Sequence, residues 1–256
     1  MLIILSLVLF VLLILIGDER GVASAFTLVG NIVVMVAYVY ILSKGANVYI
    51  STFFVTIIIS TLTLFAQNGV NIKTISAVMA AGIVMLGLLC ICAFIVYRGK
   101  LGGYSEIDLH EEDVAFLYNE IKISAYEIMT AVVLLSLLGA IMDTALAIST
   151  AIFEVNANNK DLTMRELIKS GDNIGKDIIG TTINTLLFAG MGESMFLMML
   201  FARYKYTFLQ LINSKAFIQE LFIIGVSNIG CIIIIPLTSL ITAYFLKKEK
   251  TEIQSV

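Results

Sequence analysis

The sequence predicts an all-α fold, a polytopic transmembrane helical bundle of about seven helices. Two observations carry this prediction: 59% of the 256 residues are hydrophobic, and only 14% are charged. A soluble domain contains about 25% charged residues, so this composition is typical of an integral membrane protein. The charges are also clustered, which leaves apolar runs near the length of about 20 residues that crosses a bilayer. We therefore expect a single integral membrane domain over residues 1–256.

Seven apolar segments lie between the charges, and each is a predicted transmembrane helix. They are residues 2–16, 22–42, 48–66, 75–97, 128–153, 178–201 and 221–246. Five contain no charge, whereas the fifth contains Asp143 and the sixth contains Glu193. In hydrocarbon each backbone amide must be satisfied within its own segment, so the segments should be helical. The residue alternation of a membrane β-barrel is absent.

The first segment is short, because its 15 apolar residues rise only about 22 Å as a helix. A cleavable signal sequence is the alternative, since Ala23-Ser24-Ala25 resembles a cleavage site. However, no Lys or Arg precedes the apolar run. In addition, the charges at residues 18–20 lie between this run and Ala23-Ser24-Ala25. We therefore expect residues 2–16 to be retained as a transmembrane helix.

The positive charges predict the side of the membrane that each connection occupies. If the connection after the fifth segment is cytoplasmic, nine Lys and Arg residues lie on the cytoplasmic side and seven on the other. The nine include the dense C-terminal group of Lys247, Lys248 and Lys250. The sequence thus favours a multi-pass protein of the cell membrane, with its N-terminus outside and its C-terminus in the cytoplasm.

Three connections are longer than simple turns. Residues 98–122 are acidic around His110 and could bind a divalent cation, but the spacing of an EF-hand is absent, which favours a solvated charged segment. Residues 156–177 and 203–220 are predicted amphipathic connectors. A capping-box pattern begins at Thr163, and the short helix after it should lie on the membrane surface.

Composition and spacing exclude several classes of function. The net charge of −3 gives no basic surface for nucleic acid, and the three cysteines lie in apolar runs, where they act as small hydrophobic residues. The pair Gly175-Lys176 lacks the first glycine and the hydroxyl of a phosphate-binding loop. One histidine in the whole chain excludes a zinc site of the zincin type. We expect no enzymatic activity, no metal and no cofactor.

Asp143 lies a few residues past the middle of its predicted helix. A carboxylate at that depth is costly and usually faces the bundle interior or a water-filled cavity. At 3.6 residues per turn, five small or polar residues share its face: Ser136, Gly139, Ala147, Thr150 and Glu154. Such a stripe lets another helix approach closely. Two interpretations stay open, a packing seam with one satisfied Asp and a proton or ion relay.

The sixth segment supplies the expected partner of Asp143. Thr181, Asn184 and Thr185 share one face and lie one to two turns into the membrane. Their hydroxyl and amide groups could bond the carboxylate or hold a water molecule beside it. The sequence therefore predicts a candidate ion or proton relay formed by Asp143, Thr181, Asn184 and Thr185.

Two motifs in these segments resemble the signature of the YibE/F family. They are residues 138–155 (LGAIMDTALAISTAIFEV) and residues 175–186 (GKDIIGTTINTL). The likeness extends over essentially the whole chain, including residues 69–71 and 213–217. The resemblance implies a bacterial multi-pass membrane protein, and it does not imply a substrate.

The fifth and sixth segments also resemble, more distantly, the fourth and fifth helices of SecF-like proteins in the RND transporter superfamily. Matching intramembrane acids carry proton coupling there, so this resemblance implies a coupling role for Asp143. The chain departs from that pattern at Ile148-Ser149-Thr150, where a SecF-like helix continues with Phe-Asp-Arg. The second charged pair is therefore absent.

Two hypotheses for function follow. The first is a transporter-like membrane protein that is ion- or proton-coupled through Asp143. The alternative is a noncatalytic membrane scaffold or assembly subunit, in which the small-residue stripe is a contact surface. For both, the expected partners are the lipid bilayer and either a paralogous YibE/F-type subunit or a second copy of the chain.

Overall fold

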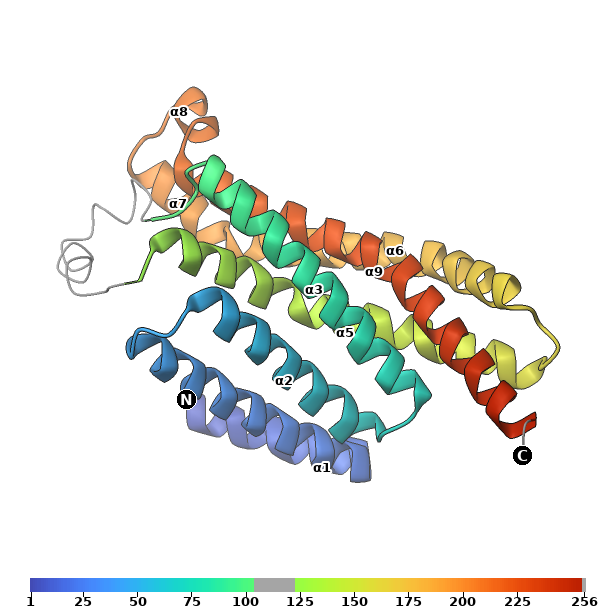
Figure 1. Cartoon of the computed structure of the whole chain (residues 1–256). Coiled ribbons are helices and arrows are strands. Elements are labelled where there is room, and N and C mark those ends of the chain that lie inside the picture. Colours follow the sequence, from blue (N-terminus) through green and yellow to red (C-terminus); the bar gives the residue numbers. More distant parts are fainter. Residues whose placement is uncertain (104–122, 255–256) are drawn as a thin grey trace.

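The structure, a computed structural model, describes residues 1–103 and 123–254 and is all-helical in these ranges. Within these ranges, six helices are long and apolar enough to cross a membrane, and a shorter apolar helix, Ile4–Asp18, precedes them. The predicted all-α bundle is therefore confirmed (Figure 1). Its helices are α1 (Leu2–Ser43), α2 (Val48–Asn68), α3 (Ile72–Arg98), α5 (Ala125–Asn158), α6 (Met164–Glu193), α7 (Met195–Arg203), α8 (Phe208–Ile212) and α9 (Lys215–Gln254). The acidic residues around His110 lie outside the described ranges.

The helix α1 consists of two arms joined at a sharp kink. Asp18 has a left-handed backbone conformation, with φ 45° and ψ −131°. The chain reverses there, so that residues 2–17 lie beside Arg20–Ser43 (Figure 1). Gly21 permits the close approach of the arms, because a Cβ atom at this position would lie 1.8 Å from the carbonyl oxygen of Leu13. The first two predicted helices thus form a hairpin whose first arm is the shorter.

The helix α5 lies in the core of the bundle and packs against α2, α3, α6 and α9. Its inward faces carry large apolar side chains such as Leu137, Ile141 and Ile148, which are fully buried. The helix α3 contributes small side chains to the same core, including Ala77 and Ala81. Small residues let helix backbones approach closely in a membrane, which is how α3 fits against α5.

Glycines bring α6 and α9 together as an antiparallel pair. A Cβ atom at Gly175 would lie 2.2 Å from Cγ2 of Ile235, and one at Gly190 would lie 2.4 Å from Cγ1 of Ile224. These distances are far below van der Waals contact, so only glycine fits at either position without a shift of the neighbouring side chain. The two helices therefore owe their close packing to residues that have no side chain.

The predicted connector 156–177 does not form a separate helix on the membrane surface. The helix α6 begins at Met164 and continues without interruption to Glu193. The predicted capping box is present, because the backbone N–H of Thr163 donates to the carboxylate of Glu166 at 2.7 Å and the Thr163 hydroxyl accepts from the Glu166 N–H. Leu167 is completely buried, which holds the first turns of α6 in the bundle.

The turn that follows α3 is fastened to the beginning of α9. Nζ of Lys215 donates a hydrogen bond to the carbonyl oxygen of Gly102 at 2.5 Å. Nε2 of Gln219 donates to the carbonyl oxygens of Leu101 at 2.6 Å and Gly103 at 3.1 Å. Side chains of one helix therefore satisfy three successive backbone carbonyls of a turn that is distant in the sequence.

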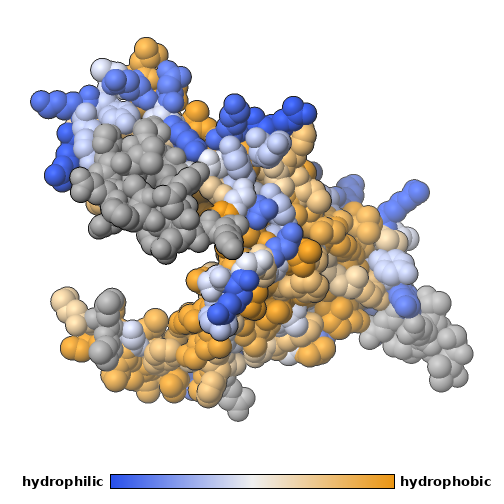
Figure 2. Space-filling model, turned by 60° about the vertical axis from the view of Figure 1, so that its left-hand side comes forward, coloured by the Kyte–Doolittle hydropathy of each residue, from blue (hydrophilic) through white to orange (hydrophobic). Residues whose placement is uncertain are grey.

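The helices alternate in direction, which gives the bundle two ends. We call one the kink end: it holds the α1 kink, the α2–α3 turn, the α5–α6 connection and the C-terminal part of α9 (Figure 1). The connections from α1 to α2 and from α7 to α9 lie at the opposite end, together with the end of α3 and the beginning of α5. Apolar side chains cover much of the outer surface between them (Figure 2), as a lipid environment requires.

Candidate functional site

The stripe on α5 that carries Asp143 faces outward from the chain. Of the six residues on this face, Thr150 is half-buried and the other five are exposed: Ser136, Gly139, Asp143, Ala147 and Glu154. The remaining faces of α5 pack into the core, where Leu138, Ile141 and Ile152 are buried. These six residues are the stripe that helical periodicity predicts. Among the helices of the described ranges, none buries the part of this face that carries Asp143.

Asp143 lies at the middle of α5, which is 34 residues long. Its side chain is exposed, and its carboxylate has no hydrogen bond or ion pair with any residue of the described ranges. Gly139 leaves open space one turn away, because a Cβ atom there would have no neighbour within 4 Å. An uncompensated carboxylate in the middle of a membrane-spanning helix is therefore the feature that any functional account must explain.

The predicted partners on α6 do not bond to Asp143 within one chain. Thr181, Asn184 and Thr185 are all exposed on the outside of α6. The Thr181 hydroxyl donates to the carbonyl oxygen of Ile178 at 2.8 Å, and the Thr185 hydroxyl donates to that of Thr181 at 2.9 Å. These hydroxyls are occupied by their own helix, as is usual for Thr in transmembrane helices. A relay through the four residues stays a prediction.

The helices α5 and α6 are nevertheless neighbours. Their contact lies near the kink end, where a Cβ atom at Gly171 would lie 2.5 Å from Cδ1 of Ile152. Leu167, one turn before Gly171, is buried in the same core. This contact lies nearer the kink end than Asp143 does, and the polar residues of both faces are exposed in the described ranges.

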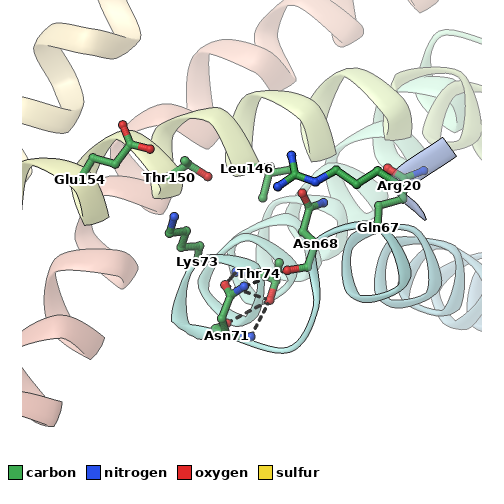
Figure 3. Close-up of a pocket in the computed structure, with 9 residues that line it drawn as sticks. All are labelled: Arg20, Gln67, Asn68, Asn71, Lys73, Thr74, Leu146, Thr150 and Glu154. Carbon is green, nitrogen blue, oxygen red and sulfur yellow. Dashed lines mark hydrogen bonds between the residues drawn. The ribbon is translucent and has the colours of Figure 1, made fainter. Parts of the chain in front are cut away.

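A polar cavity of about 410 Å³ lies at the kink end, and the sequence did not predict it (Figure 3). Its lining residues are Arg20, Gln67, Asn68, Asn71, Lys73, Thr74, Leu146, Thr150 and Glu154. They come from the second arm of α1, the α2–α3 turn and α5, so no local spacing could have revealed them. Because Thr150 and Glu154 also belong to the α5 stripe, the cavity adjoins the face that carries Asp143.

The cavity holds three charged side chains that are not paired with one another. Arg20 and Lys73 form no ion pair with Glu154 or with any other carboxylate of the part of the chain that the structure describes. The ammonium group of Lys73 lies over the ring of Phe153, 4.4 Å from its centroid. Asn71 and Thr74 are engaged in the capping box that begins α3. Within the described ranges, the three charged groups therefore have no partner of opposite charge.

Comparison with known proteins agrees with the resemblance of the motifs. The family model described as YibE/F-like protein matches residues 5–248, which includes the α5 stripe, the polar face of α6 and the cavity residues. No curated protein and no solved structure matches the chain. Since the family match covers nearly the whole sequence, the chain belongs to the YibE/F-like family of multi-pass membrane proteins.

Proposed function

We propose that the chain is one subunit of a paired, transporter-like membrane protein that is ion- or proton-coupled through Asp143. The observation that carries this proposal is the exposure of Asp143 at the middle of α5, on a stripe of small and polar residues. In the working assembly the stripe faces a second subunit, which is either a second copy of the chain or a paralogous YibE/F-type protein.

The energetics of a carboxylate in the membrane support this assembly. An Asp at the centre of a transmembrane helix costs roughly 2.5–3.5 kcal/mol or more in contact with lipid, so such residues face other helices or water. Gly139 and Ala147 flank Asp143 on the same face, and they allow the backbone of another helix to approach closely. A second subunit on the stripe would therefore remove Asp143 from lipid without altering the core.

The chemistry expected at this interface is transfer of a proton or binding of a cation. A carboxylate accepts both, and the hydroxyl and amide groups of Thr181, Asn184 and Thr185 could orient a water molecule or ion beside it. The charge distribution favours an external N-terminus and a cytoplasmic C-terminus. Lys247 and Lys248, at the kink end, would lie on the cytoplasmic side.

The test uses the full chain reconstituted in liposomes that contain a pH-sensitive dye. Asp143→Asn keeps the size of the side chain and most of its hydrogen bonding but removes titration. We expect the variant to insert normally and to lose proton uptake, whereas Asp143→Glu keeps a partial activity with a shifted pH profile. Full uptake by Asp143→Asn at every pH from roughly 5.5 to 8.5, the range that a shifted carboxylate samples, would refute the coupling role.

A noncatalytic scaffold is the second candidate, and the small-residue stripe favours it because such stripes commonly form helix contacts. In this account Asp143 only hydrogen-bonds to its partner, so an Asn should replace it without loss. The variant Asp143→Asn distinguishes the two proposals. If the protein is a scaffold, the variant should still assemble and still rescue a deletion phenotype. If it is a coupled transporter, the variant should assemble but fail to rescue.

A further inference from the structure

We propose that the polar cavity at the kink end binds the headgroup of a membrane lipid, and that the headgroup is of the phosphoethanolamine type. The cavity lies between the second arm of α1, the α2–α3 turn and the last turns of α5 (Figure 3). Its volume of about 410 Å³ is in the range of small-ligand sites. The proposal does not rest on the coupling role, because Asp143 does not line this cavity, although Thr150 and Glu154 belong to both the cavity and the stripe.

The position of the cavity matches the depth of lipid headgroups. Asn68 ends α2 and Asn71 caps α3, so the cavity lies where two membrane-spanning helices end. On α1, Arg20 faces the cavity, while Val22 and Phe26 immediately after it are apolar and exposed. Such a change from charged to exposed apolar residues marks the boundary between headgroups and hydrocarbon. A lipid can therefore reach the cavity from within the membrane.

Two cationic side chains reach the same space from different segments. The guanidinium group of Arg20 enters from α1, and the ammonium group of Lys73 enters from the first turn of α3 (Figure 3). Neither has a carboxylate partner in the described ranges. Arginine binds phosphate through a planar fork of donors, and lysine supplies a point charge. Basic pockets between transmembrane helices bind lipid phosphates by this combination.

The remaining lining residues favour a ligand that carries a cationic group beside its phosphate. Glu154 is the only acidic side chain among them, and no Lys or Arg of the described ranges pairs with it. A carboxylate beside a phosphate site would repel a purely anionic headgroup, but it provides a partner for a primary ammonium group. Gln67 and Thr150 add neutral hydrogen-bonding groups. In a phosphoethanolamine headgroup, the phosphodiester would pair with the cationic side chains of the lining and the ammonium group with the acidic one.

The experiment measures lipid binding to the full chain by native mass spectrometry in detergent. The probes are phosphatidylethanolamine, phosphatidylcholine and phosphatidylglycerol with the same acyl chains, and inorganic phosphate as a competitor. We expect phosphatidylethanolamine to bind most tightly. Arg20→Gln and Lys73→Gln should each weaken its binding about tenfold, as for loss of one hydrogen bond between charged groups. Glu154→Gln should remove the preference for ethanolamine over choline.

The matched control is Lys44→Gln. Lys44 also lies over an aromatic ring, 5.3 Å from the centroid of Tyr40, but it is at the opposite end and lines no part of this cavity. It should leave lipid binding unchanged. Lys73→Arg keeps the charge and should keep binding, which separates loss of the phosphate contact from loss of folding.

Three results would overturn the assignment. Unchanged phosphatidylethanolamine binding in both Arg20→Gln and Lys73→Gln would exclude the cavity as the lipid site. Equal binding of phosphatidylglycerol, together with no effect of Glu154→Gln, would exclude the ethanolamine headgroup. Complete displacement of the lipid by millimolar inorganic phosphate would identify a free phosphate group, and not a lipid, as the occupant.

Discussion

The hydroxyl oxygen of Tyr38 lies 2.7 Å from Oγ1 of Thr52, and both residues are buried between α1 and α2. The Thr52 hydroxyl already donates its hydrogen to the carbonyl oxygen of Val48 at 2.6 Å. Tyr38 must therefore be the donor in the bond between the two side chains. This bond ties the second arm of α1 to the rest of the bundle within the membrane.

Removal of this hydrogen bond should lower the free energy of unfolding by a small but measurable amount. We expect Tyr38→Phe to lower the free energy of unfolding in detergent by about 0.6 kcal/mol, a typical value for hydrogen bonds between transmembrane helices. Tyr40→Phe is the control, because Tyr40 is exposed. A double-mutant cycle with Thr52→Val measures the coupling, and additive effects would contradict a direct bond.

Replacing a glycine between α6 and α9 by alanine should lower the stability of the fold, which is the opposite of the usual effect of this substitution in a helix. Gly→Ala in a helix normally stabilises by about 1 kcal/mol. Gly175→Ala should instead destabilise by about 1–3 kcal/mol, because the new methyl group overlaps Ile235. Gly87→Ala is the control, since nothing lies within 4 Å of its Cβ position. Thermal unfolding of both variants in detergent checks this, and equal midpoints would be evidence against close packing at Gly175.

Cross-linking tests the partner of the α5 stripe. In a background where the exposed Cys90 is replaced by Ser, Ala147→Cys should form disulfide-linked dimers in the membrane if a second copy covers the stripe. Ile83→Cys on α3 should not, although Ile83 is also exposed. Cross-linked products are measured on non-reducing gels. Without dimers at Ala147, a second copy is excluded as the partner.

The orientation of the chain can be measured with fused reporters. The bias of Lys and Arg predicts that a reporter after Val256 is cytoplasmic and that one inserted near His110 is external. A phosphatase that is active outside the cytoplasm, paired with a fluorescent protein that is active inside it, distinguishes the two sides. Opposite signals at both positions would invert the orientation and leave the helices of the bundle unchanged.

The sequence predicted the helices because charges interrupt apolar runs, and such runs can satisfy their backbone in a membrane only as helices. Because helical periodicity is local, the sequence also supports the prediction that Asp143 and Ala147 share one face of α5. It predicted a reversal between residues 16 and 22, but not the positive φ at Asp18, because that conformation is uncommon for residues other than glycine. It likewise missed the cavity, because Arg20, Lys73 and Glu154 meet only through tertiary packing.

The continuity of α6 was missed for a different reason. Polar residues such as Asp172 and Lys176 make the first half of this helix look like a surface segment. Gly171 and Gly175, however, let this half pack closely against α5 and α9, which offsets its low hydrophobicity. Tertiary contacts of small residues thus extend back to Met164 a helix that composition alone would have begun at residue 178.

The bonds from Lys215 and Gln219 to the turn after α3 have a mechanical consequence. They hold the end of α3 to the beginning of α9 at the end opposite the kink, and each would cost about 1 kcal/mol to break. At the kink end, no hydrogen bond between side chains of α3 and α9 is present in the described ranges. A rocking movement that separates these helices should therefore pivot about the fastened end and open at the kink end.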